Sequence, residues 1–195
     1  MSAVVPMTTA RRLDRADGLQ VAERRYLIDP TDTPWKAGSW ADIMRLTDGY
    51  APQGQSWCER VREGLALAPS GQEVADYLAR MKEADSTAPD PRASIIMVGM
   101  LVDAFPNSRA SGAFIDAATH DAVSMGFTPY HLATACQKLR RTSKFLPSIA
   151  EFLAECASAR KHMQSAISLA ERMQDRIEQA RLALAHQGDT NEPRP

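Results

Sequence analysis

The sequence predicts an all-α protein: a helical bundle with a long C-terminal helix. A small N-terminal helical subdomain can precede this bundle. Three observations predict this fold class. Apolar residues recur every three or four positions in one segment after another, which is the spacing of a helix face. Ser-x-x-Glu and Asp-Pro pairs stand where these segments begin, as capping residues do. No segment alternates apolar and polar residues with the period of two that is typical of a half-buried strand.

The composition is that of an ordinary globular protein. Its 195 residues are 44% hydrophobic and 24% charged, with a formal net charge of -1, so an electrostatic partner would have to meet a local patch. The three cysteines are widely spaced and form no C-x-x-C pair, which argues against a disulfide framework or a zinc site and for a reducing compartment. The start holds no apolar run of signal-peptide length, and the longest apolar block, residues 93–102, is too short to span a bilayer. We therefore expect a cytoplasmic protein with no membrane partner.

The first 85 residues are predicted to form an arm and a small helical subdomain. Residues 1–25 end in a charged run and are expected to be flexible or loosely helical. Residues 26–85 begin as a loop and then show three short helical patterns, the third opened by a capping box of Ser70 and Glu73. The apolar faces of these helices are predicted to be Trp40, Ile43 and Met44; then Trp57, Val61 and Leu65; then Val74, Tyr77, Leu78 and Met81. The three tryptophans of this region, one of them Trp35, suit either a small core or a partner-binding surface.

Residues 90–160 are predicted to form the helical core, after a linker over residues 85–90. Asp90 and Pro91 suit the N-cap and first turn of a helix that ends at Phe105-Pro106. This helix lacks a polar face between residues 95 and 102, so we expect it to be buried on most sides. Two further helices follow, with the inward residues Phe114, Ala118, Ala122 and Met125, ended by Gly126, and then, after Thr128-Pro129, Leu132, Ala133, Cys136 and Leu139.

The stretch from Thr142 to Leu153 joins two helical patterns and defines how the second begins. Ser148 and Glu151 have the spacing of a capping box, and Pro147 cannot continue the preceding helix but can pack on Phe152 as a hydrophobic staple. The residues by themselves indicate a well-made helix start. The alternative is that the bend also displays a binding surface.

The last helix is predicted to be nearly forty residues long. Its apolar or small residues follow strict three- and four-residue steps: Ile149, Phe152, Cys156, Ala159, Met163, Ala166, Ala170, Met173, Ile177, Ala180 and Leu184. Residues 161–186 form an extension beyond the core, and residues 187–195 are expected to be a disordered tail. The middle of the stripe is mostly alanine, a weak seam. Two alternatives stay open: an intermolecular coiled coil, which would make a homodimer, or a helix folded back on its own chain.

Known catalytic and cofactor motifs are absent from the sequence. It contains neither G-x-x-x-x-G-K-S/T nor G-x-G-x-x-G, and its four histidines are far apart without metal-ligand spacing. His131 and Cys136 are interpreted as a surface histidine and a core thiol. We therefore expect no enzyme, no cofactor and no metal site.

One charged cluster stands out from the balanced background. No acidic residue occurs between Asp121 and Glu151, and four basic residues gather just before the bend: Lys138, Arg140, Arg141 and Lys144. Such a cluster could contact phosphates, although basic side chains also favour a helix C-terminus because of the helix dipole.

Residues 92–158 resemble the core of the phage replicative-helicase loader/inhibitor family. A first apolar helix ends in an aromatic-proline pair, a second carries an aromatic residue, and a third, basic helix leads into a segment of the form K-F-x-P-S-I-A-E. The residues that carry the resemblance are Phe105 and Pro106, Phe114, and the run Lys144-Phe145-Leu146-Pro147-Ser148-Ile149-Ala150-Glu151. The match covers about a third of the chain. Residues 1–85 and the extension beyond Lys161 depart from the compact family pattern.

The resemblance implies a non-catalytic DNA-replication accessory protein of phage or prophage type. Such a protein binds a DnaB-type hexameric replicative helicase, holds it inactive or loads it, and hands it to single-stranded DNA or to an origin-binding protein. The physical means would be helix-in-groove contacts and exposed apolar anchors. The alternatives are a DNA-binding or packaging-type phage protein that uses the basic helix end, and a coiled-coil interaction protein.

Overall fold

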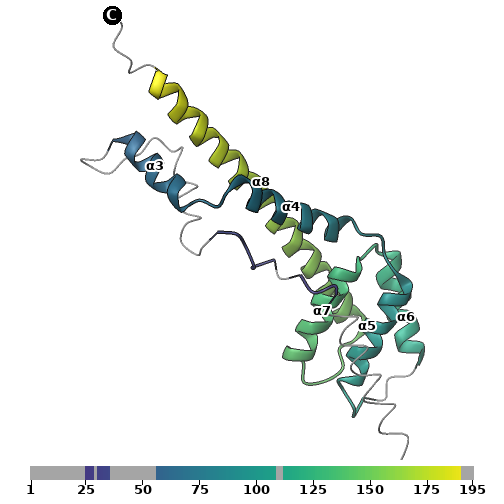
Figure 1. Ribbon diagram of the computed structural model, residues 1–195. Coiled ribbons are helices and arrows are strands. Elements are labelled where there is room, and N and C mark those ends of the chain that lie inside the picture. The colour runs from purple at the N-terminus through teal and green to yellow at the C-terminus, as the bar shows by residue number, and fades with distance from the viewer. Residues whose placement is uncertain (1–24, 29, 36–55, 109–111, 190–195) are drawn as a thin grey trace, which may run out of the picture. The chain divides into compact units, whose positions relative to one another are not determined.

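The computed structural model describes residues 25–28, 30–35, 56–108 and 112–189, and within them it is all-helical (Figure 1). The predicted fold class is confirmed. The helices are α3 (Trp57–Leu67), α4 (Gly71–Ser86), α5 (Pro91–Asp103), α6 (Gly112–Ser124), α7 (Pro129–Thr142) and α8 (Ile149–Asp189). Three predicted segments lie wholly or largely outside the described residues: the arm up to residue 24, the helix with Trp40, Ile43 and Met44, and the tail from residue 190.

The described residues belong to two compact units. The first holds residues 83–163 together with residues 25–28, and the second holds residues 30–82 together with the chain from Gln164 onward. Helix α8 begins in the first unit and continues in the second. No helix in the described part of the chain is both long enough and apolar enough to cross a membrane.

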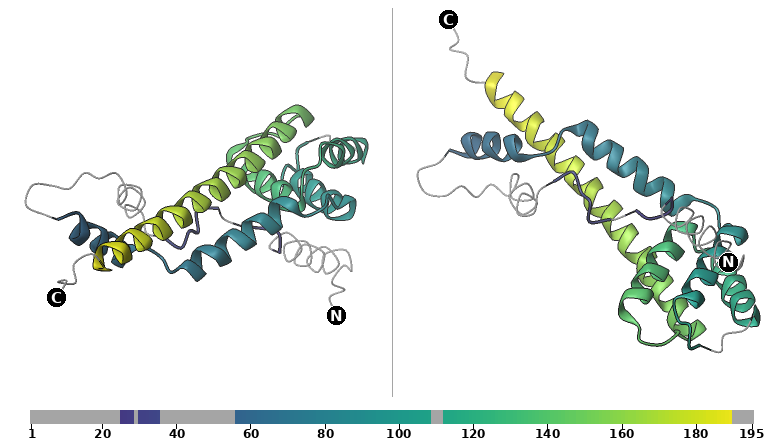
Figure 2. Two further views of the ribbon diagram at one scale, coloured as in Figure 1. Left: turned by 90° about the horizontal axis from the view of Figure 1, so that it is seen from above. Right: turned by 60° about the horizontal axis from the view of Figure 1, so that its bottom comes forward.

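The core of the first unit lies between α5, α6, α7 and the first turns of α8, which are gathered together in both views of Figure 2. Helix α5 contacts both α6 and α7. The largest fully buried side chains of this core are Phe127, Phe152, Met97, Leu101 and Leu132. The inward residues predicted for α7, namely Leu132, Ala133, Cys136 and Leu139, are all buried.

Local capping explains where the helices of this unit begin and end. The Asp90 side chain accepts hydrogen bonds from the N–H groups of Arg92 and Ala93, and Pro91 occupies the first turn of α5. Gly126 follows α6 with a φ of 70°. Its N–H donates to Val123 O and that of Phe127 donates to Ala122 O, the paired bonds of a Schellman motif.

Burial in this unit follows the predictions with three exceptions. Helix α5 is buried or half-buried throughout residues 96–102, as predicted, but Ile95 is 48% exposed. An apolar residue in a helix is covered only where a neighbouring element faces it. Met125 lies past the last turn of α6 and is exposed, and His131 is buried and not on the surface.

The second unit has its own buried face on α4. Val74, Tyr77, Leu78 and Met81 are buried, as the spacing predicts, and the capping box of Ser70 and Glu73 is present. Trp35 packs edge-on against Tyr77 at a centroid distance of 5.4 Å, and the Tyr77 hydroxyl donates to Pro30 O at 2.7 Å. Trp35 is therefore a core residue.

Helix α4 and the second part of α8 run antiparallel within this unit. Lys82 Nζ lies 2.7 Å from Glu171 Oε1, and a Cβ placed on Gly71 would lie 3.7 Å from Arg181 Nη1. The alanine-rich stripe of α8 is covered in the single chain, since Ala170, Met173, Ile177 and Ala180 are all buried.

Two predicted boundaries shift by a few residues. Helix α4 continues to Ser86, so Asp85 and Ser86 belong to a helix and not to the linker. Helix α8 continues to Asp189, past the predicted end at 186. Both shifts extend a helix into polar residues, where periodicity gives no signal.

Candidate partner-binding site

The α7–α8 corner, residues 143–148, is fixed at both ends by hydrogen bonds. The N–H of Ser143 donates to Leu139 O at 2.9 Å and closes α7. At the other end, the N–H and hydroxyl of Ser148 both donate to Glu151 Oε2 at 2.8 Å, and the N–H of Glu151 donates to the Ser148 hydroxyl oxygen at 3.3 Å. The predicted capping box is confirmed. Pro147 and Phe152 are both buried, as the predicted staple requires.

These hydrogen bonds also favour the ionised form of Glu151. The two hydrogen bonds from Ser148, backbone first and hydroxyl second, hold the pKa of Glu151 below its usual range. Glu151 therefore stays an anion through the neutral and mildly acidic range, and the start of α8 keeps its cap there.

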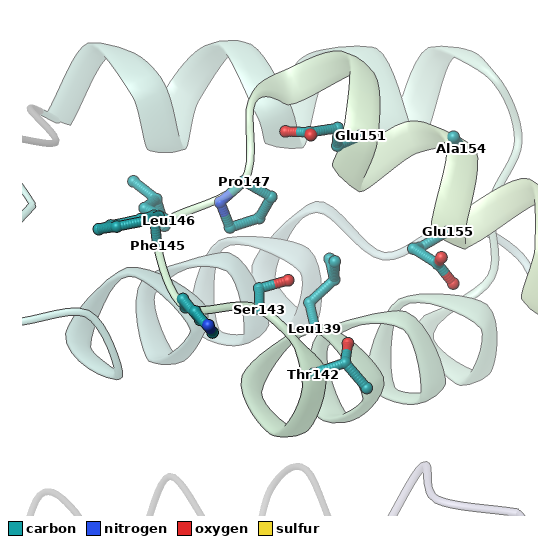
Figure 3. Close-up of a pocket in the computed structure, with 10 residues that line it drawn as sticks. Leu139, Thr142, Ser143, Phe145, Leu146, Pro147, Glu151, Ala154 and Glu155 are labelled. Atoms are coloured by element: carbon teal, nitrogen blue, oxygen red, sulfur yellow. The ribbon is translucent and has the colours of Figure 1, made fainter.

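The corner displays one large aromatic side chain. Phe145 is 83% exposed, while Leu146 beside it packs against the core cluster and Pro147 is buried. The hydrogen bonds at Ser143 and Ser148 hold the backbone on both sides of this exposed ring. In Figure 3 Phe145 lies at the opposite end of the hollow from Glu155.

Two hollows lie on either side of this aromatic. The Phe105 hollow, of about 400 Å³, is lined by Ala104, Phe105, Pro106, Asn107, Ser108, Lys144, Phe145 and Leu146. The Glu155 hollow, of about 430 Å³, is lined by Leu139, Thr142, Ser143, Lys144, Phe145, Leu146, Pro147, Glu151, Ala154 and Glu155 (Figure 3). The three residues from Lys144 to Leu146 are common to both. Phe145 is thus an exposed aromatic that borders two hollows, which makes it a candidate anchor for an interface.

The structure brings some of the predicted motif residues together and separates others. Phe105, which precedes Phe145 by forty positions, and Pro106 line the same hollow as Phe145. Pro147 and Glu151 line the second hollow, and Ser148 holds the cap. Phe114 does not reach the corner; it is half-buried against the core cluster.

The four basic residues do not act as one patch. Lys138 Nζ is 2.6 Å from Glu155 Oε2, so its charge is already paired. Arg140 is half-buried, whereas Arg141 and Lys144 are exposed and make no ion pair with another described residue. Among the four, Lys144 alone lines the two hollows.

A buried polar pair that sequence reasoning missed lies elsewhere in the first unit. His131 is only 1% exposed. Its Nδ1 accepts the N–H of Thr128 at 3.2 Å, so the neutral ring carries its proton on Nε2, which donates to Asp85 Oδ1 at 3.1 Å. The signal was present in the sequence, because Thr128 and His131 have capping-box spacing with histidine in the place of glutamate.

The surroundings of His131 favour its neutral form. Burial is the largest effect and lowers the pKa of His131; the Asp85 carboxylate raises it, and the charge of Arg160 lowers it. The Arg160 guanidinium lies 4.3 Å from the centroid of the Phe127 ring and donates to Met125 O at 3.0 Å. Arg160 thus ties α8 to the turn before α7, and Phe127 in that turn packs edge-on against His131 of α7 at a centroid distance of 6.4 Å.

Nothing in the described residues has the arrangement of a metal site, since no three His, Cys, Asp or Glu side chains converge on one point there. Cys136 and Cys156 are buried in the core, and burial raises the pKa of the Cys156 thiol. A thiol in this environment stays protonated and is a poor nucleophile.

Comparison of the chain with protein-family models, with curated proteins and with solved structures finds no match.

Proposed function

We propose that this protein is a non-catalytic DNA-replication accessory factor that binds a DnaB-type hexameric replicative helicase and loads or inhibits it. The observation that carries the proposal is the α7–α8 corner, where a rigid, capped bend exposes Phe145 between two hollows. The residues that resemble the helicase loader/inhibitor family, Phe105-Pro106 and Lys144-Phe145, meet at this corner.

The chemistry of the corner suits binding more than reaction. Its carboxylates are already engaged, Glu151 by the helix cap and Glu155 by Lys138. Aromatic side chains in the centre of an interface supply much of its binding free energy, because they bury a large apolar area. A partner that covers Phe145 gains this contribution, because the ring is already exposed.

The buried stripe of α8 supports a chain that works without dimerising through this helix. Ala170, Met173, Ile177 and Ala180 are already covered within one chain, so no apolar seam is left for a second copy at these positions. We therefore propose the corner, and not the extension, as the surface that contacts the partner.

Purified protein and the replicative helicase of its host test the proposal together. We expect the two to co-elute in size-exclusion chromatography, and we expect the helicase's ATPase rate and its loading onto single-stranded DNA to change when the protein is added. A protein that binds no hexameric helicase and leaves both activities unchanged would refute the proposal.

The same purified protein can be used to distinguish the proposed helicase binding from the alternative of direct DNA binding. Affinity for single-stranded DNA in the absence of helicase, falling steeply with salt and lost when Arg140 and Arg141 are replaced by alanine, would favour a direct DNA-binding protein. The proposal expects helicase binding to survive those two substitutions.

A further inference from the structure

The two hollows beside Phe145 differ in charge. The described residues that line the Phe105 hollow are mostly apolar or small, and among them Lys144 is the one ionisable residue. The Glu155 hollow also contains Lys144 but adds two carboxylates, Glu151 and Glu155. The Phe105 hollow is thus the electropositive side of the aromatic.

The charge of Lys144 is available to a partner. Lys144 is exposed and forms no ion pair with a described residue. Arg141, three residues earlier, is also exposed and also forms no ion pair with a described residue. The stretch from residue 122 to residue 150 contains no acidic residue. Of the two carboxylates that line the Glu155 hollow with Lys144, Glu151 is engaged by the helix cap and Glu155 by Lys138. An apolar hollow with a single unpaired cation at its edge is complementary to an apolar side chain next to a carboxylate.

We infer that the Phe105 hollow binds an acidic, amphipathic segment of a partner protein, with an apolar side chain in the hollow and a neighbouring carboxylate on Lys144. The same segment covers Phe145. The inference relies on the proposed function for the statement that the partner is a protein, and it adds the chemistry of the segment that the partner must present.

Single-stranded nucleic acid fits the corner less well than an acidic peptide. Exposed aromatics can stack bases between basic side chains, but the Glu155 hollow on the other side of Phe145 adds the Glu151 carboxylate, and Lys138 and Glu155 there neutralise each other. Phosphates that continue from Phe145 into the Glu155 hollow would meet the Glu151 carboxylate. A short peptide segment needs the Phe105 side alone.

Selection from a library of random peptides against the full-length protein tests the inference. We expect the enriched peptides to pair an apolar residue with Asp or Glu. A synthetic peptide of the enriched sequence should bind at least about ten-fold more weakly to Lys144→Glu and to Phe145→Ala than to wild type. Lys161→Glu is the matched charge control, because Lys161 is exposed on α8 away from both hollows, and it should bind like wild type. A peptide with Lys in place of the acidic residue should prefer Lys144→Glu.

Several results would overturn the inference. These are enriched peptides that are basic or indifferent to charge, no enriched peptide at all, or binding that Lys144→Glu leaves unchanged. A labelled oligothymidylate that binds wild type and not Phe145→Ala would assign the corner to nucleic acid, and a dimer abolished by Phe145→Ala would assign it to a second copy. If the helicase binds while the peptide preference fails, the proposed function survives and the inference does not.

Discussion

Two phenylalanines seven positions apart have opposite roles. Phe152 is fully buried in the core, whereas Phe145 is exposed at the corner. We expect Phe152→Ala to lower the free energy of unfolding by about 3–5 kcal/mol, because it removes a buried ring and leaves a cavity. Phe145→Ala should change it by less than about 0.5 kcal/mol. Urea denaturation followed by circular dichroism measures both, and a large loss for Phe145→Ala would show that the ring supports the fold and not a partner.

His131 makes stability depend on pH. Its pKa is lowered in the folded state from a usual value of 6.5, so the unfolded chain binds more protons as the pH falls through this value. We therefore expect the contribution of the neutral His131 to stability to be fully present above about pH 6.5 and to be lost progressively as the pH falls below it. His131→Gln, which keeps an acceptor for the N–H of Thr128, should flatten the dependence between about pH 7 and pH 5.

Thermal unfolding of both proteins over this pH range measures the difference. The other histidines remain in the variant, so the comparison isolates His131. Equal pH dependence in wild type and His131→Gln would contradict the neutral, buried histidine described above.

At the scale of single elements, the start of α8 depends on the capping box. Ser148→Ala removes the hydroxyl that both receives the N–H of Glu151 and donates to its carboxylate. We expect a loss of about 1 kcal/mol in the free energy of unfolding. Ser148→Thr retains the cap and is the control. Chemical denaturation measures both variants, and equal stability of Ser148→Ala and wild type would mean that the box does not hold the bend.

The stripe on the second part of α8 offers a test of what covers it. Ala170 is fully buried in the single chain, so Ala170→Leu should overpack the second unit and destabilise it by about 1–3 kcal/mol. In an intermolecular seam the same leucine would strengthen association. Denaturation combined with light scattering decides between the two, and a more stable, dimeric Ala170→Leu would contradict the internal packing.

At the scale of the whole molecule, the sequence allowed local features to be predicted, but not contacts between residues that are far apart in the chain. The fold class, the capping boxes at Ser70 and Ser148 and the buried stripes of α4 and α7 follow from spacing alone. The contact of His131 with Asp85 joins residues 46 positions apart, and no local pattern indicates it. The Phe105 hollow could not be predicted either, because it is lined by two motifs that lie about forty positions apart in the chain.

Exposure is the other property that sequence left undecided. Ile95 and Phe145 are as apolar as their buried neighbours, and only the placement of other helices determines which of them solvent reaches. The sequence likewise did not show which residues of the basic cluster keep an unpaired charge, because the pairing of Lys138 with Glu155 depends on how α7 packs against α8. The spacing of capping and apolar residues thus located the α7–α8 corner in the sequence. The exposure of Phe145 and the two hollows became visible only in the packed structure.

The most direct test of the account is the affinity of the replicative helicase for wild type, Phe145→Ala and Leu67→Ala, measured by biolayer interferometry. Leu67 is the matched control, since it is 63% exposed on α3 and lines neither hollow. We predict that Phe145→Ala weakens binding at least about ten-fold while Leu67→Ala binds like wild type. Equal affinity of wild type and Phe145→Ala would contradict a partner-binding role for the α7–α8 corner.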